Sequence, residues 1–118
     1  MRSNIIVNFQ VEGIHCWPDC PIEEVSFLKT PHRHIFQIEC KKEVTHLDRD
    51  IEIIQFNRKI QDYLLNKYGT GRGFYNLKKI CDFGSKSCEM IAVELLGEFQ
   101  LNYCKVLEDG ENGAEVQL

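Results

Sequence analysis

The stretch from Ile5 to His15 reads IIVNFQVEGIH, and apolar side chains occupy most of its odd-numbered positions. Polar side chains fill several of the even-numbered positions, and a period of two is typical of a strand with one buried face. His15 falls on the apolar face. A second stretch with this alternation runs from His32 to Val44 and places His32 and His34 together on one face. We therefore expect these two strands to form the centre of the fold.

The segment between the two strands reads as a loop. Turn-forming residues run from Trp17 to Pro21, and a short stretch from Glu24 to Lys29 has no clear period. Its structure stays open at this point.

The middle of the chain predicts a first amphipathic helix. Apolar residues recur at spacings of three and four from Asp50 to about Tyr68, and Asp48 and Asp50 are suited to capping its start. A glycine-rich stretch, Gly69 to Gly73, ends the helix. It follows a helix and not a strand, and it lacks the Lys-Ser/Thr ending of a phosphate-binding loop, so we interpret it as a connection.

A second helix and two more strands complete the expected order. Ser85 or Ser87 can cap the helix, and Glu89 lies in its first turn, where the helix dipole favours a negative charge. The later elements are predicted from alternation and turn residues: a strand from Leu101 to Leu107, a turn over Asp109 to Gly113, and a partner strand from Ala114 to Leu118.

Length, charge and cysteine content limit the classes of function. The 118 residues suit one domain, residues 1–118, and the net charge of −4 argues against a surface that contacts nucleic-acid phosphates. No apolar run approaches the roughly 20 residues of a membrane span. No segment like a signal peptide precedes the first strand, so we expect the six cysteines to be reduced thiols in the cytoplasm.

Three histidines form a candidate metal site. His32 and His34, two apart on one strand, can bind the same ion, and His15 joins them if the first two strands pair as a hairpin. Three imidazoles with an open fourth position are typical of a catalytic or ligand-binding zinc site. The alternative is that they are polar residues at a strand end. His46 lies past the strand beside Asp48, and we interpret it as a surface residue.

The cysteines and one glutamate are further candidates. Cys16 and Cys20 have no second pair at zinc-finger spacing, so a finger is not expected. Cys20 can instead lie near the histidines as a nucleophile or proton carrier, or it is an ordinary loop thiol. Glu108, at the end of a strand, can accept two parallel N–H donors from a planar heterocycle. The remaining thiols considered are expected in the core: Cys40, Cys88 and Cys104.

This combination resembles the 6-pyruvoyltetrahydropterin synthase and 6-carboxytetrahydropterin synthase family. The residues that carry the resemblance are His15, His32, His34, the helix opening from Ser85 to Glu89, and Glu108. The resemblance implies the tunnelling fold (T-fold), an α+β architecture with a four-stranded antiparallel sheet and two helices on one face, in the order ββααββ. It also implies assembly into an oligomeric barrel, such as a hexamer.

The resemblance further implies a ligand and the residues that bind it. Zinc would be held by the three histidines, and a pterin or purine-type molecule by Ser87, Glu89 and Glu108. Arg33 stands where the family has a glycine and would contact an anionic group of the ligand. Small-molecule binding between subunits is therefore expected, without a nucleic-acid or membrane partner.

Two positions depart from the family pattern. Leu28 and Lys29 lie where the family has its catalytic cysteine, and either Asp62-Tyr63 or the glycine-rich stretch, without a histidine, lies where it has an Asp-His pair. Cys20 and His46 are the candidates to replace the missing thiol and base. Three hypotheses follow: a zinc lyase acting on dihydroneopterin triphosphate or a related pterin, a non-catalytic protein that binds a purine, pterin or nucleotide, and an interaction module with incidental histidines.

Overall fold

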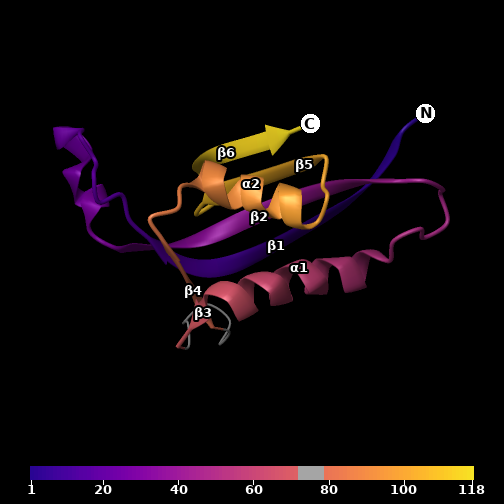
Figure 1. Cartoon of the computed structure of the whole chain (residues 1–118), viewed down its shortest axis with the longest axis horizontal. Helices are drawn as coiled ribbons and strands as arrows, with labels where there is room; N and C mark the ends of the chain where they lie inside the picture. Colours follow the sequence, from indigo (N-terminus) through magenta and orange to yellow (C-terminus); the bar gives the residue numbers. More distant parts are fainter. Residues whose placement is uncertain (72–78) are drawn as a thin grey trace.

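A long antiparallel hairpin forms the centre of the sheet. The computed structural model describes residues 1–71 and 79–118, and it pairs β1 (Ser3–His15) with β2 (His32–Val44) along their whole length (Figure 1). The register sets His15 opposite His32 and Ser3 opposite Val44. Both strands agree closely with the alternation in the sequence, and the predicted hairpin is confirmed.

The connection between β1 and β2 forms a projecting arm, which we define as Cys16–Pro31. Its one regular element is the 3-10 helix η1 (Glu23–Lys29), none of whose residues is buried. Figure 1 shows the arm extending away from the sheet at one end of the molecule. Its exposed side chains include Phe27, which is 67% exposed.

The first helix, α1, spans Ile53–Tyr68. Its N-terminus is capped by Glu52, whose carboxylate accepts from the Gln55 amide at 2.8 Å. Asp50 does not cap it, because its carboxylate accepts from the Thr45 amide at 2.7 Å and closes the preceding turn. The helix therefore begins three residues later than the pattern predicted.

The second helix, α2, spans Cys88–Glu98. Ser87 is the capping residue, since its hydroxyl accepts from the Met90 amide at 3.2 Å. The side chains of Cys88, Ile91, Ala92 and Leu95 are buried, as the periodicity predicts.

The sheet is larger than predicted. It has six strands in the order β3-β4-β1-β2-β5-β6. The additional strands are β3 (Gly69–Thr70) and β4 (Ile80–Gly84), and β5 (Tyr103–Glu108) and β6 (Asn112–Gln117) form the closing hairpin. Strand β4 pairs in parallel with β1, so the sheet is mixed. The prediction of a four-stranded antiparallel sheet, and with it the tunnelling fold, was therefore wrong.

The error has a physical origin. Strand β3 has only two residues and lies in the glycine-rich stretch interpreted above as a connection, whereas β4 has five residues in a segment to which the sequence pattern assigns no element. A parallel pairing also leaves no turn signal between its partners, because the chain must cross over first. The remainder of the glycine-rich stretch, from Arg72 on, lies outside the described residues.

Both helices pack on one face of the sheet. Helix α1 contacts β1 and β4, and α2 contacts β5 and β6. The core between them includes the fully buried rings and aliphatic chains of Phe36, Ile38, Ile60, Leu95 and Val106. Within the part of the chain described, none of the helices combines the length and the apolar character needed to cross a bilayer.

All six cysteines are free thiols. The predicted core positions of Cys40, Cys88 and Cys104 are confirmed, as all three are buried. Cys40 and Cys104 face each other across β2 and β5, with 3.9 Å between their sulfur atoms. The hydrogen bond between the two thiols raises the pKa of Cys40, and burial raises it further.

Candidate metal centre and adjoining pocket

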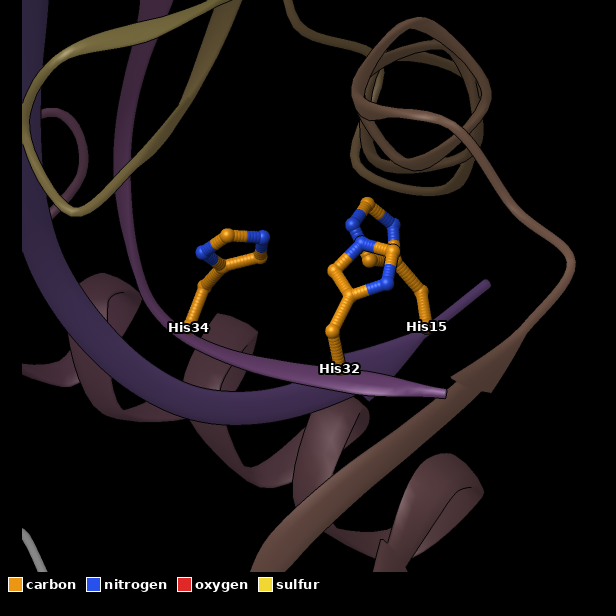
Figure 2. A group of neighbouring side chains, drawn as sticks. All are labelled: His15, His32 and His34. Carbon is orange, nitrogen blue, oxygen red and sulfur yellow. The ribbon is translucent and has the colours of Figure 1, made fainter. Parts of the chain in front are cut away.

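The hairpin brings the three histidines together. His15 is the last residue of β1 and His32 the first of β2, and His34 follows on the same face of β2. The ring centroids lie 4.6 Å apart for His15 and His32, 5.1 Å for His32 and His34, and 5.4 Å for His15 and His34. One ring nitrogen from each lies within 4.8 Å of the others, and Figure 2 shows the rings gathered above the two strands.

A local irregularity of the sheet adjoins His15. The parallel pairing of β1 with β4 shifts register between Ile14 and His15, so that His15 lies opposite Gly84. Such irregularities bend a strand and redirect the side chain that follows. The backbone at His15 is therefore held between β2 on one side and β4 on the other.

Each ring is fixed by its Nδ1 atom. Nδ1 of His15 lies 2.9 Å from the carbonyl oxygen of Lys86, and Nδ1 of His32 lies 2.9 Å from that of Thr30. Nδ1 of His34 lies 2.7 Å from a carboxylate oxygen of Asp109. Carbonyl and carboxylate oxygens accept hydrogen bonds, so each neutral ring carries its proton on Nδ1 and presents a lone pair at Nε2.

The lone pairs of two rings face a carboxylate. Nε2 of His15 lies 2.9 Å from Oε2 of Glu108, and Nε2 of His34 lies 3.5 Å from Oε1. These nitrogen and oxygen atoms are close, but neither contact has hydrogen-bond geometry. Both Nε2 atoms are buried and have no hydrogen-bond partner among the described residues. Acceptors that face one another in this way need a positive charge between them, either a proton or a metal ion.

Asp109 contacts the Nδ1 side of the His34 ring. Its two carboxylate oxygens accept from Nδ1 of His34 and, at 2.9 Å, from the Ile35 amide. These two hydrogen bonds, the one from His34 foremost, lower the pKa of Asp109 below its ordinary value. The carboxylate is therefore ionised at neutral pH.

The donor set fits zinc. Neutral imidazole nitrogen is a preferred zinc ligand, and a metal-binding histidine usually donates its other N–H to a carbonyl or carboxylate. All three rings meet both conditions. Zn–N bonds of about 2.0–2.1 Å place neighbouring ligand atoms of a tetrahedral ion about 3.3 Å apart. The three ring nitrogens lie within 4.8 Å of one another, so the rings would move closer together on binding one ion.

A pocket of about 550 Å³ opens beside the histidines. Its walls come from the arm, from the start of α2 and from the β5–β6 turn. The lining includes His15, Cys16, Trp17, Leu28, His32, Ser87, Cys88, Glu89, Glu108 and Asn112. A volume of this size is within the range of small-molecule sites. Burial and the nearby Glu108 carboxylate raise the pKa of Cys88 to about 12, so this thiol stays protonated.

The predicted ligand-binding residues fall into two groups. Ser87, Glu89 and Glu108 line the pocket together. Arg33 points to the other face of β2, where its guanidinium pairs with the buried carboxylate of Glu12. The structure therefore does not bring Arg33 to this pocket.

The two predicted catalytic residues lie apart from the pocket lining. Cys20 is buried in the arm, and its thiol is 3.7 Å from the Ile22 carbonyl oxygen. His46 is exposed beyond the opposite end of β2, 3.5 Å from a carboxylate oxygen of Asp50. Neither is brought to the three histidines.

Sequence reasoning missed three features of the site. Cys16 lines the pocket next to His15, and its only signal was its position directly after that histidine. Asp109 was assigned to a turn and not to the site. The carbonyl acceptors of Thr30 and Lys86 belong to the backbone, which every residue type carries, so no sequence pattern could have revealed them.

Comparisons with known proteins inform the fold but not the function. No protein-family model and no curated protein matches the chain. Among solved structures, it is similar to the crystal structure of the uncharacterized protein WS1659 from Wolinella succinogenes. The TM-score is 0.62 at 15% identity, over 99% of this chain and 98% of that one. This likeness concerns the fold alone. The resemblance to the pterin synthases stays a prediction.

Proposed function

We propose that the protein binds one zinc ion through His15, His32 and His34 and uses it to hold a small molecule in the adjoining pocket. The ion would supply a Lewis acid at the edge of the pocket. The chain's own residues orient the three rings and line the space where a ligand would lie.

One observation carries the metal proposal. The Nδ1 atoms of all three rings are committed to acceptors, which directs the three Nε2 lone pairs to the same region. Metal-binding histidines usually donate their other ring N–H to a carbonyl or carboxylate, and these three rings are placed to do so. The nearby Glu108 carboxylate adds negative charge, which favours a cation there.

Metal binding can be tested with one substitution and one control. Chelator-treated protein is titrated with zinc by calorimetry, and bound metal is counted by elemental analysis. We expect about one zinc per chain for the parent and for His46→Ala, whose imidazole is exposed and distant from the site. His32→Ala should lose stoichiometric binding while it keeps its fold, because His32 is only partly buried. Equal zinc content in His32→Ala and the parent would sink the proposal.

We propose further that the ligand is a planar nitrogen heterocycle of the pterin or purine type. Glu108 supports this, because its carboxylate lies at the pocket wall and can accept two parallel N–H donors. Trp17 and Leu28 add apolar surface on another wall. The resemblance of the site residues to the 6-pyruvoyltetrahydropterin and 6-carboxytetrahydropterin synthases points to the same class of ligand.

Trp17 provides a direct readout of ligand binding. It is the one tryptophan of the chain and it lines the pocket, so a bound heterocycle should quench its fluorescence. Pterins and purines are titrated into the zinc-loaded parent, Glu108→Gln and the control Glu98→Gln, with the zinc content of each variant measured first. The parent and the control should bind alike and Glu108→Gln more weakly. Unchanged affinity in Glu108→Gln at full zinc content would contradict the assignment.

A catalytic role is the second candidate function. Cys16 lines the pocket beside His15 and is partly exposed, so a thiol is present at the metal site although Cys20 and His46 are not. The reaction proposed is that of a lyase acting on dihydroneopterin triphosphate or a related pterin. Zinc-loaded protein is incubated with such pterins and the products are separated. Turnover that depends on Cys16 would support catalysis, whereas binding without turnover would leave a sequestering or sensing protein.

We also propose that the protein forms homo-oligomers in a reducing compartment such as the cytoplasm. The arm exposes Phe27 and Ile22, which are 67% and 47% exposed, and an apolar surface of this kind is often covered by a partner. Six free thiols suit a reducing environment. Native mass spectrometry tests the assembly, and a monomer at micromolar concentration would contradict it.

A further inference from the structure

We propose that Asp109 is a positioning residue that sets the tautomer of His34 and thereby couples zinc binding to the β5–β6 turn. This inference rests on the proposed zinc site. It concerns a residue that touches neither the ion nor a ligand and acts through the His34 ring.

The first support is the chemistry of the three acceptors. His15 and His32 are held by the backbone carbonyls of Lys86 and Thr30, which are neutral and which no side-chain substitution removes. Among the described residues, His34 differs in being held by an ionised carboxylate, that of Asp109. A charged acceptor strengthens the hydrogen bond and makes the opposite ring nitrogen a better metal ligand.

The second support is the backbone of the turn. Asp109 and Gly110 both have positive φ, 55° and 70°, and the Glu111 amide donates to the Glu108 carbonyl at 2.9 Å. These features match a type I′ turn. Positive φ is uncommon outside glycine and is tolerated best by asparagine and aspartate. The turn therefore admits few residues at position 109, and the one present directs its carboxylate back to β2.

The third support is that Asp109 is held on both sides. Its amide donates to the Ile35 carbonyl at 2.8 Å, and its Oδ1 accepts from the Ile35 amide at 2.9 Å. Only Oδ2 is left for His34. The carboxylate is thus fixed in space before any ion binds, and the ring must adapt to it.

The coupling follows from the position of the turn. Glu108 directly precedes Asp109 and Asn112 follows it three residues later, and both line the pocket. An ion at Nε2 of His34 makes Nδ1–H a stronger donor and tightens its bond to Asp109. The same hydrogen bond then stabilises the pocket wall, and a ligand that binds this wall favours the metal-bound form in return.

The substitution Asp109→Asn tests the inference with little change of shape. Its oxygen can still accept from the Ile35 amide, but an amino group then faces Nδ1 of His34. Two donors cannot pair, so the His34 proton should move from Nδ1 to Nε2, the nitrogen proposed to bind zinc. Asp62→Asn, an exposed change on α1 with the same loss of charge, is the control.

Two readouts decide the outcome. Long-range nitrogen NMR on metal-free protein at pH 8 reports the His34 tautomer, and calorimetry reports zinc affinity. We expect Nδ1–H in the parent and in Asp62→Asn, Nε2–H in Asp109→Asn, and a zinc affinity lowered by about 10- to 100-fold in Asp109→Asn alone. An unchanged tautomer with unchanged affinity would overturn the inference.

The tautomer measurement also separates the two proposals. If the parent binds no zinc, the proposed function fails and the coupling to metal fails with it. The NMR spectra of the metal-free proteins still decide whether Asp109 sets the His34 tautomer. If the parent binds zinc and Asp109→Asn binds it equally well, the zinc site stands and the positioning role is lost.

Discussion

The ring of Phe36 stands edge-on to the ring of His15, with 5.2 Å between their centroids and an interplanar angle of 89°. It makes the same kind of contact with His34, at 5.7 Å, and with Phe83 on β4, at 5.2 Å. Phe36 is fully buried, so His15 and His34 pack against a tightly held apolar ring. Gly13 leaves room for the Phe36 and Phe83 rings, because an added Cβ would lie 2.7 Å from each of them.

Gly13→Ala is expected to displace the Phe36 ring. Overpacking a tight core typically destabilises a protein by about 1–3 kcal/mol, and the shifted ring should also weaken zinc binding through His15 and His34. The free energy of unfolding is measured by urea denaturation of the metal-free protein. Gly97→Ala is the control, since an added Cβ on that exposed face of α2 meets no atom within 4 Å. It should leave stability equal or raise it by up to about 1 kcal/mol.

Glu94 joins the two helices, and its removal is expected to loosen them. Its carboxylate accepts from the hydroxyls of Tyr63 and Tyr68 and from Lys67, all on α1, and Lys86 lies 3.6 Å away. Glu94→Gln should lower the free energy of unfolding by about 1.5–3 kcal/mol, the range for hydrogen bonds to a charged group. Glu98→Gln, on the exposed side of α2, should change it little.

The effect of Glu94 should depend on pH. Partial burial works to raise its pKa, but the hydrogen bonds from Tyr63, Tyr68 and Lys67 outweigh burial and lower the pKa from 4.5 to about 2. A carboxyl whose pKa falls on folding stabilises the protein above its unfolded value, and that contribution is lost as the pH falls towards the folded value. The difference in stability between parent and Glu94→Gln should be full at pH 7 and shrink between about pH 4.5 and pH 2. A constant difference would contradict this account.

One thiol should react in the folded protein. Cys16 is partly exposed, and the other five cysteines are buried. Burial raises the pKa of Cys81 to about 12, which also keeps its thiol from reacting. Iodoacetamide at pH 8 should label Cys16 first, and mass spectrometry should find the other sites labelled only after denaturation. Early labelling of a buried thiol would show that its part of the core opens readily.

Ser87 should contribute to the stability of α2 through its hydroxyl. Ser87→Ala removes the acceptor of the Met90 amide and should lower the free energy of unfolding by about 1 kcal/mol. Ser87→Asp retains a capping oxygen and should recover that loss. The two variants separate capping from ligand binding: if Ser87 contacts the ligand, Ser87→Asp should restore stability but not affinity.

The sequence predicted the parts of the site that follow a short period. Alternation placed His32 and His34 on one face of their strand and His15 on the apolar face of the other, since a strand repeats every two residues. The one further assumption was that the two strands pair as a hairpin. The cap of α1 was predicted wrongly, because Asp50 closes the turn with Thr45 and the helix is capped by Glu52, which the sequence did not single out.

Non-local features of the fold and site could not be predicted in this way. Strand β4 is recognisable only by its partner, since Ile80–Gly84 is short and pairs with a strand far earlier in the chain. The link between Asp109 and His34 spans two elements that are distant in sequence. No local pattern records such a contact, and it becomes visible only when β2 and β5 are side by side.

His15 is the last residue of β1 and His32 the first of β2, so the two residues lie directly before and after the arm. Pairing between the strands holds them in place, and the length of the arm does not enter that pairing. The arm itself contributes Trp17 and Leu28 to the pocket. Under the proposed function, replacements in the arm that keep the Thr30 carbonyl, the acceptor for Nδ1 of His32, would alter which ligand is bound without removing a zinc ligand. The proposed metal ligands and this part of the pocket wall would then lie in different segments of the chain, so that one could be changed while the other is kept.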